Sequence, residues 1–124
     1  MKQNKERILF VDDEVITLKI TRKLLESTGF DVEICKSSAE AMEKLSAEKF
    51  DLVIIDISMP ALSGFDLLEL MQSFDYQVPV IFLSANDNDW TIKEALEMGA
   101  NRFVSKEKEF NSLPEIVKET LASA

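Results

Sequence analysis

Five short apolar runs alternate with longer segments of helical period, and this alternation restricts the possible folds more than any other feature of the chain. Such alternation is typical of βα units that wind around a parallel sheet. The apolar runs are Ile8–Val11, Val32–Cys35, Leu52–Ile55, Val78–Leu83 and Phe103–Val104. The pattern therefore predicts an α/β protein, a single (βα)5 domain with a doubly wound parallel sheet.

The second apolar run differs from the other four. Those four are continuous in apolar residues, as in strands that are buried on both faces of a sheet. In Asp31–Cys35, polar and apolar residues alternate, which is typical of a strand that is half exposed. We therefore expect this strand to lie at an edge of the sheet.

The segments between the runs carry signals for the beginning and end of helices. Three pairs have the spacing of a capping box: Ser37 with Glu40, Ser112 with Glu115 and, in a weaker form, Ser63 with Asp66. Two sets of apolar residues each share one helical face: Ile16, Ile20 and Leu24 in the first helix, and Ile92, Ala95 and Leu96 in the fourth. Gly29 and Gly99 stand where a left-handed cap would end these two helices.

Length and charge narrow the classes of function. A chain of 124 residues has the usual size of one domain, to which we assign residues 1–124. The formal net charge of −9 would repel a phosphate backbone, so we expect no direct binding to nucleic acid. No apolar run approaches the roughly 20 residues that cross a membrane, and no signal peptide is evident, so we expect a cytoplasmic protein without membrane contact. Histidine is absent, which leaves carboxylates, hydroxyls and lysines for any chemistry.

Three carboxylates follow predicted strands directly. Asp12 and Asp13 come after the first strand, and Asp56 comes after the third. In parallel α/β sheets, ligands bind beyond the carboxyl ends of the strands, where the winding reverses. If the strands take the flavodoxin-like order 2-1-3-4-5, the three carboxylates converge at that point. Three anions so close require a raised pKa or a hard cation between them, and Mg²⁺ suits oxygen ligands of this kind.

Two further residues stand at the ends of the last two strands. Ser84 ends the fourth strand, and Lys106 follows the fifth. A hydroxyl and an ammonium group at these positions can bind the oxygens of a phosphoryl group that is carried by a carboxylate beside Mg²⁺. These side chains therefore indicate a site for a phosphoryl group.

Taken together, these residues resemble the receiver domain of bacterial two-component response regulators. The resemblance runs from about Arg7 to Leu121 and includes Met59-Pro60, Gly64 and the run Gly99–Phe103. It implies that Asp56 accepts a phosphoryl group from a sensor histidine kinase or a histidine phosphotransfer protein. The implied Mg²⁺ ligands are Asp13, Asp56 and the carbonyl of Ser58, with Asp12 binding through water. The resemblance also implies that Ser84 and Lys106 contact the phosphoryl oxygens and that Phe103 is an aromatic switch.

One position departs from the family pattern. Most receivers follow the lysine with a proline in a cis bond, whereas Glu107 follows Lys106 here. A cis bond before a residue other than proline costs roughly 3–4 kcal/mol. We therefore expect a trans bond, which leaves the placement of the Lys106 ammonium open.

Trp90 stands out in the fourth helix. A helical projection places it with Glu94 and Glu97, opposite Ile92 and Leu96. A tryptophan on a polar face suggests a surface that binds a partner, and Phe103 would lie on the same surface. The alternative is that the Trp90 ring folds back over the first turn of its helix.

Simpler interpretations remain open for single residues. Asp12 alone would serve as a helix N-cap, Ser84 would begin a turn, Lys106 would be a surface lysine, and Phe103 would be a core residue. None of these interpretations accounts for Asp13 and Asp56 together.

The leading hypothesis is a phosphorylation-controlled signalling module rather than an enzyme. One alternative is a pseudo-receiver that binds partners without phosphorylation, and the Lys106–Glu107 loop keeps it open. The other is a Mg²⁺-dependent phosphotransferase of the haloacid dehalogenase type, which expects Asp-x-Asp where this chain has Glu14 two residues after Asp12. We expect either a stand-alone regulator or a receiver from a longer chain, and the kinase and the downstream partner stay unidentified.

Overall fold

A five-stranded parallel sheet lies at the centre of the computed structural model, which describes residues 5–124. Its strands are β1 (Arg7–Val11), β2 (Asp31–Cys35), β3 (Leu52–Asp56), β4 (Val80–Ser84) and β5 (Arg102–Ser105). The strand order is β2-β1-β3-β4-β5, and each neighbouring pair is parallel. The α/β fold with the order 2-1-3-4-5 is therefore confirmed, and β2 is an edge strand. The first four residues of the predicted domain lie outside the described part.

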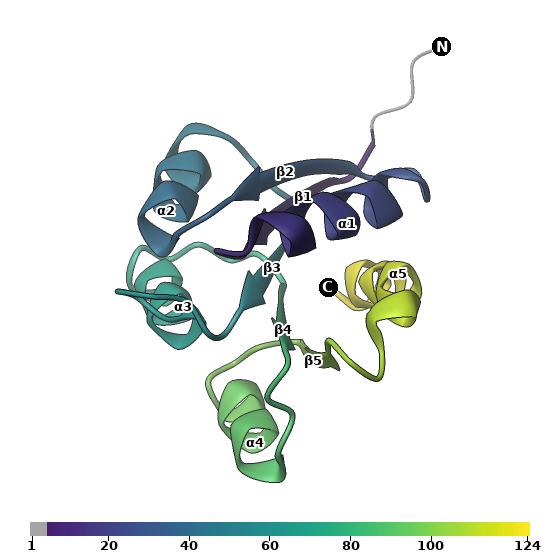
Figure 1. The fold of residues 1–124 in the computed structure, drawn as a ribbon. Coiled ribbons are helices and arrows are strands. Elements are labelled where there is room, and N and C mark those ends of the chain that lie inside the picture. Colours follow the sequence, from purple (N-terminus) through teal and green to yellow (C-terminus); the bar gives the residue numbers. More distant parts are fainter. Residues whose placement is uncertain (1–4) are drawn as a thin grey trace.

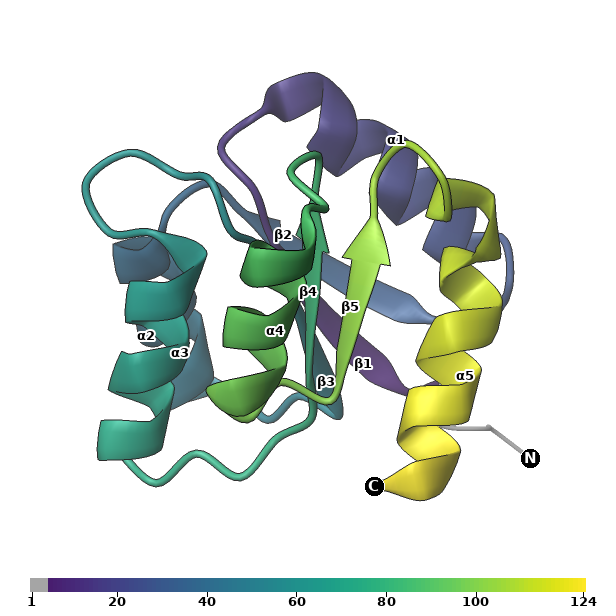
Figure 2. The same ribbon diagram turned by 90° about the horizontal axis from the view of Figure 1, so that it is seen from below.

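Helices cover both faces of this sheet. They are α1 (Val15–Glu26), α2 (Ser38–Ala47), α3 (Gly64–Ser73), α4 (Asp89–Glu97) and α5 (Leu113–Ser123), with the short 3-10 helix η1 (Phe110–Ser112) before α5. Figures 1 and 2 show α1 and α5 on one face and α2, α3 and α4 on the other. Among residues 5–124 there is no helix long and apolar enough to cross a membrane.

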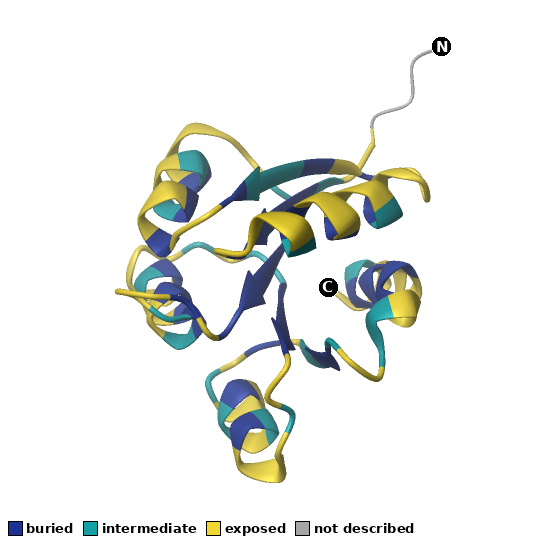
Figure 3. Ribbon diagram, in the orientation of Figure 1, coloured by how far each residue is buried: buried dark blue, intermediate teal, exposed yellow. Residues whose placement is uncertain are grey.

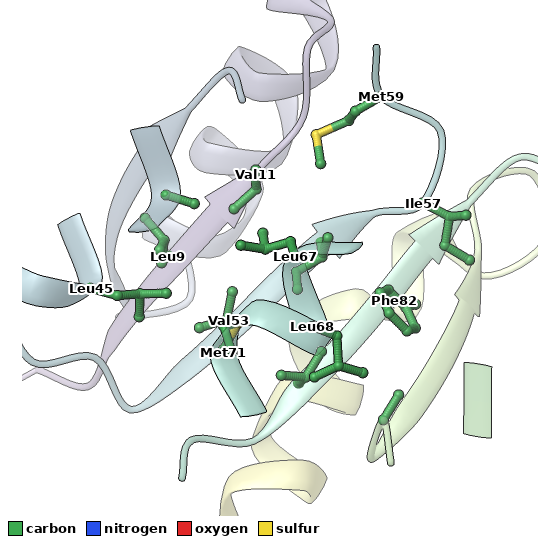
Figure 4. Packing of buried hydrophobic residues seen from close by; sticks show 14 of the residues in the cluster. Leu9, Val11, Leu45, Val53, Ile57, Met59, Leu67, Leu68, Met71 and Phe82 are labelled. Atoms are coloured by element: carbon green, nitrogen blue, oxygen red, sulfur yellow. The ribbon is translucent and has the colours of Figure 1, made fainter. Parts of the chain in front are cut away.

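Each face of the sheet contributes to its own hydrophobic core. Successive strand residues point to opposite faces, so Leu9 and Val11 pack under α2 and α3, while Ile8 and Phe10 pack under α1 and α5. Figure 3 shows the central strands as buried between helices whose outer surfaces are exposed. Figure 4 shows the first core, in which Phe82 and Met71 lie between the sheet and α3. Burial on both faces explains why the central strands are continuously apolar.

The strands differ from their predicted bounds at several ends. β3 includes one more residue at the carboxyl end, so Asp56 is a strand residue rather than the first residue of a loop, while Ser84 ends β4 as predicted. The predicted start of the fourth strand at Val78 is wrong, because β4 begins at Val80. Pro79 has no N–H to donate, and the N–H of Val80 donates to the Asn101 side chain at 3.0 Å.

The apolar face expected for the first helix is mostly exposed, and of its three residues only Leu24 packs against the core. Ile16 is 70% exposed and Ile20 is 52% exposed, whereas Leu18, Thr21 and Leu25 face the sheet and α5. The sequence of α1 contains two apolar stripes, and their periods are too similar for periodicity to choose between them. Similarly in α4, Thr91 and Ala95 are buried while Leu96 is exposed.

Helix ends follow most of the predicted signals. The Ser37 hydroxyl accepts from the N–H of Glu40 as predicted, but the Glu40 side chain accepts from the N–H of Lys36, so the second bond of a capping box is missing there. Gly29 and Gly99 take positive φ angles of 100° and 109° after α1 and α4, as expected for left-handed caps. Ser63 and Asp66 form a complete capping box at the start of α3. The expected cap at Ser112 is wrong, because η1 holds this residue in a helical conformation and its side chain makes no cap bond.

Candidate functional site

The carboxylates of Asp12, Asp13 and Asp56 meet at the carboxyl end of the sheet. One oxygen from each lies within 4.8 Å of the others. Asp12 is fully buried and Asp56 is 4% exposed, whereas Asp13 is open to solvent. In Figure 2 the arrows of β4 and β5 point to this edge, where the loops after the strands gather. The parallel pairing of β1 with β3 brings the three residues together, as the sequence predicted.

Asp12 is held by two hydrogen bonds. Its Oδ1 accepts from the main-chain N–H of Glu14 at 2.9 Å, and its Oδ2 accepts from Lys106 Nζ at 3.0 Å. The second bond joins the end of β1 to the loop after β5. The ammonium of Lys106 also lies 3.6 Å from Asp56 Oδ2, so one cation faces two buried carboxylates.

Asp56 has an unusually weak acidity. Burial is the main cause, and the neighbouring charge of Asp12 adds to it, so that the pKa of Asp56 rises from 3.8 to about 7. Lys106 and the N–H of Ser58, which donates to Asp56 Oδ1 at 3.3 Å, act in the opposite direction but do not cancel the rise. The Lys106 ammonium only partly balances the charges of the neighbouring carboxylates. A proton on Asp56 therefore relieves the remaining repulsion.

Lys106 remains a cation in this setting. Burial by itself would lower the pKa of Lys106, but the charge of Asp56 and the hydrogen bond to Asp12 outweigh burial and raise the pKa above its ordinary value. Three carboxylates and one ammonium leave a net negative charge at the site. Oxygen donors with this charge and spacing could hold a hard divalent cation such as Mg²⁺.

Gly64 brings the start of α3 against the end of β3. A Cβ at this position would lie 2.5 Å from the carbonyl oxygen of Asp56 and 2.8 Å from the Cα of Ile57. The N–H of Gly64 donates to the carbonyl of Ile57 at 2.9 Å. The absence of a side chain therefore lets the helix close on the loop that carries Ser58, which is itself exposed.

Ser84 and Lys106 are linked through the main chain. The N–H of Lys106 donates to the carbonyl of Ser84 at 2.9 Å, and the Ser84 hydroxyl accepts from the N–H of Asn86 at 3.0 Å. Ser84 is buried at the end of β4. Within residues 5–124 there is no cis peptide bond, so the Lys106–Glu107 bond is trans as expected, and Lys106 Nζ still reaches Asp12 and Asp56.

Trp90 lies in the first turn of α4, and Phe103 lies in the neighbouring strand β5. Phe103 is half-buried in β5, where it pairs with Phe82 of β4 and packs against the core under α3. It also lines a groove of about 290 Å³ together with Ile92 and Lys108. Trp90 is 69% exposed and lies beside Glu94 and Glu97, the polar neighbours that the helical projection predicted.

One group of residues near the site was not predicted from the sequence. The Ser105 hydroxyl donates to Asp87 Oδ2 at 2.9 Å, and Lys108 Nζ lies 3.3 Å from the same oxygen. The group joins the loop after β4 to the loop after β5. The charged residues around Lys106 in the sequence give only a weak signal for a bond between Ser105 and Asp87. The two residues meet because β4 pairs with β5.

The family model of the response regulator receiver domain matches residues 8–118. This chain belongs to the response regulator receiver domain family. It is therefore a signalling module that accepts phosphorylation, as the resemblance in the sequence implied. The matched residues include β2 to β5, all of β1 except Arg7, all of the site and about half of α5.

Curated relatives of this receiver domain are transcriptional regulatory proteins. ZraR of Klebsiella oxytoca is 33% identical over 115 residues, which are 93% of this chain and 26% of ZraR. PhoP of Bacillus subtilis, an alkaline phosphatase synthesis regulator, is 31% identical over 101 residues, which are 82% of this chain and 42% of PhoP. The chain thus spans about a quarter to about half of the length of such relatives.

Solved structures of receiver domains have the same fold. A CheY-like receiver domain from Methanospirillum hungatei JF-1 is 30% identical, with a TM-score of 0.88 over 97% of this chain and 96% of its own. TrrA from Thermotoga maritima, solved in complex with Mg²⁺ and BeF, is 29% identical, with a TM-score of 0.82 over 93% of this chain and 98% of its own.

Proposed function

We propose that Asp56 is the residue of this receiver domain that accepts the phosphoryl group. The observation that carries the proposal is the position of Asp56 at the end of a central strand, where Asp12, Asp13 and Lys106 surround it. The donor is the phosphorylated histidine of a sensor kinase or of a histidine phosphotransfer protein. Residues 1–124 form one such domain, which acts in the cytoplasm and binds neither nucleic acid nor membrane directly.

The reaction is a transfer between two nucleophiles. A carboxylate oxygen of Asp56 attacks phosphorus and forms an O–P bond, while the P–N bond to the donor imidazole breaks and its electron pair returns to nitrogen. Asp56 must first lose the proton that its raised pKa favours. The product is an acyl phosphate on this chain, and the chain does not turn it over as an enzyme would.

The acidic cluster fits Mg²⁺ as the cofactor of this transfer. Asp13, Asp56 and the carbonyl of Ser58 would hold the ion, and Asp12 would bind it through water. When bound, Mg²⁺ neutralises the charge that would repel an anionic donor. Lys106, which already lies 3.6 Å from Asp56, binds a phosphoryl oxygen by a charge-assisted hydrogen bond, and Ser84 binds another.

Labelling with a small phosphodonor tests this assignment. Wild-type protein is incubated with acetyl phosphate and Mg²⁺, and intact mass and peptide mapping locate the label. We expect one added phosphoryl group on Asp56, no label without a divalent metal, and no label in Asp56→Asn. Asp75→Asn is the matched control, because Asp75 is an exposed turn residue that should not affect labelling. A label that maps elsewhere overturns the assignment, and metal binding without labelling favours a pseudo-receiver.

Ser84 and Phe103 are the switch in this proposal. When Ser84 moves toward the phosphoryl oxygens, it leaves space that the Phe103 ring fills by turning inward. The half-buried position of Phe103 beside Phe82 supports this path. Ser84→Ala should still accept the phosphoryl group but show smaller changes in the amide chemical shifts of β5. An undiminished response in Ser84→Ala would place the coupling elsewhere.

The exposed face of α4, β5 and α5 is the proposed surface for the downstream partner. Trp90 offers the largest exposed ring on it, and Phe103 lines the groove beside it. Glu94 and Glu97 around Trp90 favour a partner with basic residues at its rim. Trp90→Ala should weaken binding of the phosphorylated protein to its partner without changing labelling of Asp56. Unchanged partner binding would overturn this surface and leave the receiver assignment intact.

A further inference from the structure

Ser105, the last residue of β5, uses all of its hydrogen-bonding groups. Its hydroxyl donates to Asp87 Oδ2 at 2.9 Å and accepts from the N–H of Lys108 at 3.2 Å. Its main-chain N–H donates to Glu109 Oε1 at 3.1 Å, and its carbonyl accepts from the N–H of Glu109 at 2.9 Å. Because Ser105 is also 4% exposed, its position is determined from several directions at once.

The segment after Lys106 has little restriction of its own. Residues 107–109 are Glu-Lys-Glu, with neither a proline to fix φ nor a residue of the apolar core. Glu107 and Lys108 are exposed. The hydrogen bonds of Ser105 to Asp87, Lys108 and Glu109 are therefore the main contacts that fix the conformation of this part of the loop.

Lys106 depends on that order directly. Its ammonium stands on a flexible four-carbon stem, and it reaches both Asp12 and Asp56 from the loop after the edge strand β5. The only fixed end of that stem is its own main chain, which follows Ser105 and donates to the carbonyl of Ser84. A shift of Ser105 would therefore move the ammonium away from the two carboxylates.

Asp87 anchors the other end of the link. It lies in the loop between β4 and α4, three residues after Ser84 and three before Trp90. The hydrogen bond from Ser105 and then that from Lys108 lower the pKa of Asp87. An ionised acceptor strengthens the bond to the Ser105 hydroxyl.

We propose that Ser105 is a positioning residue for Lys106 and that its bond to Asp87 couples the placement of the Lys106 ammonium to the loop that leads into α4. This inference rests on the proposed function, in which Lys106 contacts the transferred phosphoryl group. It adds a physical connection between that contact and the helix that carries Trp90. The acidic cluster itself is outside the link, so losing the link leaves the three carboxylates in place and only removes the Lys106 ammonium that competes with a cation for Asp12 and Asp56.

The test measures the binding of beryllofluoride, a phosphoryl mimic, in the presence of saturating Mg²⁺. Trp90 is the single tryptophan of the chain and reports binding by its fluorescence, so the midpoints of titrations are compared. We expect Ser105→Ala to weaken binding by about 3- to 10-fold, the range of a lost charge-assisted hydrogen bond that is partly replaced by water. Ser105→Thr, which keeps the hydroxyl, should bind within about twofold of wild type.

Two further variants isolate the link from general damage to the fold. Asp87→Ala removes the same bond from its more exposed side and should weaken binding in the same direction. Asp89→Ala is the matched control, because Asp89 is an exposed acid two residues further on and should leave the midpoint unchanged. Mg²⁺ affinity without beryllofluoride should not fall in any of the four variants, because a shift of Lys106 only removes a cation that competes for Asp12 and Asp56.

A double-mutant cycle separates positioning from a purely structural role. In a Lys106→Ala background, Ser105→Ala should have no further effect on the midpoint, because a residue that acts through Lys106 is silent without it. A residue that only stabilises the fold would weaken binding by the same factor in both backgrounds, and that result overturns the inference.

The outcomes also distinguish this inference from the proposed function. If wild type binds beryllofluoride, Asp56→Asn does not, and both Ser105→Ala and Asp87→Ala match wild type, then the inference is wrong and the proposed function stands. If wild type shows no saturable, Mg²⁺-dependent response, both are wrong. Should Ser105→Ala fail to fold, Asp87→Ala and its cycle with Lys106→Ala decide the question.

Discussion

The surroundings of Asp56 conflict with the charge that its proposed role requires. It must be an anion to bind a cation or to attack phosphorus, yet burial and the neighbouring Asp12 raise its pKa to about 7. Among the described residues, Lys106 is the one cation that forms an ion pair with Asp56, and its charge partly offsets the rise in pKa. Near neutral pH the carboxyl therefore exchanges its proton readily, and binding of a divalent cation should release that proton.

The raised pKa predicts a pH-dependent cost to stability. Asp56 titrates near 7 when folded and near 3.8 when unfolded, so its contribution to stability is complete below pH 4 and is lost as the pH rises through 7. In EDTA at pH 8, Asp56→Asn should therefore raise the free energy of unfolding by on the order of 2 kcal/mol. The gain should be much smaller at pH 4.5. Urea denaturation at the two pH values measures the difference.

Asp13→Asn is the control for this prediction. Asp13 belongs to the same cluster but is exposed to solvent, so its replacement should have a weaker effect at both pH values. If Asp56→Asn were destabilising at pH 8, or if its effect were the same at both pH values, the protonation of Asp56 would not explain the local electrostatics.

Among the elements, α1 has the most unexpected orientation. Its first residues follow the acidic loop closely, and it turns Leu18 and Leu25 toward the sheet while Ile16 and Ile20 face solvent. Isoleucine would bury as much apolar surface as leucine, so the choice between the two stripes is not a matter of hydrophobicity. The short connection from β1 and the packing of α5 beside α1 determine the rotation of the helix.

Alanine substitutions test the orientation of α1. Leu18→Ala removes a fully buried side chain and should lower the free energy of unfolding by about 2–5 kcal/mol. Ile16→Ala removes an exposed side chain of equal size and should change it by less than about 1 kcal/mol. Urea denaturation of both variants provides the measurement. Equal losses would mean that both stripes of α1 are buried.

The start of α3 is the second element that the site depends on. Gly64→Ala would place a Cβ 2.5 Å from the carbonyl oxygen of Asp56, where backbone rather than a flexible side chain must yield. We expect a loss of about 2 kcal/mol or more in stability, together with weaker Mg²⁺ binding as the end of β3 shifts. Thermal denaturation and metal titration give the two readouts.

Gly29→Ala is the matched glycine control. Its Cβ would meet no atom within 4 Å, but its φ of 100° disfavours any side chain. It should therefore cost about 1 kcal/mol while Mg²⁺ binding stays at the wild-type level. If Gly64→Ala bound Mg²⁺ as well as Gly29→Ala does, the contact between α3 and the acidic loop would not matter for the site.

The molecule is acidic as a whole, and three of its carboxylates lie so close together that they repel one another. With 23 acidic and 14 basic residues it carries a large negative charge, and three of its carboxylates meet at one edge of the sheet. A cation that binds only the folded state stabilises it by mass action. Binding of Mg²⁺ at this site would therefore link the stability of the molecule to metal concentration.

Thermal denaturation in Mg²⁺ tests this linkage. At a metal concentration about 100 times the dissociation constant, the stabilisation should reach about 2.7 kcal/mol, which corresponds to an increase in Tm on the order of 10 °C. Asp56→Asn should lose most of this increase. Glu43→Gln, which removes an exposed charge on α2, should retain it. An equal increase in both variants would indicate screening of the net charge instead of a specific site.

The alternation of apolar runs and helical segments was enough to predict the class of the fold, because each run must be buried and each helix must cover a sheet. The positions of Asp12, Asp13, Asp56, Ser84 and Lys106 at the ends of predicted strands also indicated that they lie at one edge of the sheet. These inferences depend on local pattern and on general rules for parallel sheets. The family model matches residues 8–118, which contain all of these side chains.

Only the tertiary structure decided which stripe of α1 is buried and which residues hold the loop around Lys106. Both outcomes depend on groups that are distant in sequence: α5 lies against α1, and Asp87 meets Ser105 across the pairing of β4 with β5. The raised pKa of Asp56 has the same origin, since burial and the nearby Asp12 exist only in the assembled sheet. Periodicity and spacing describe neighbours along the chain, whereas packing and electrostatics depend on neighbours in space.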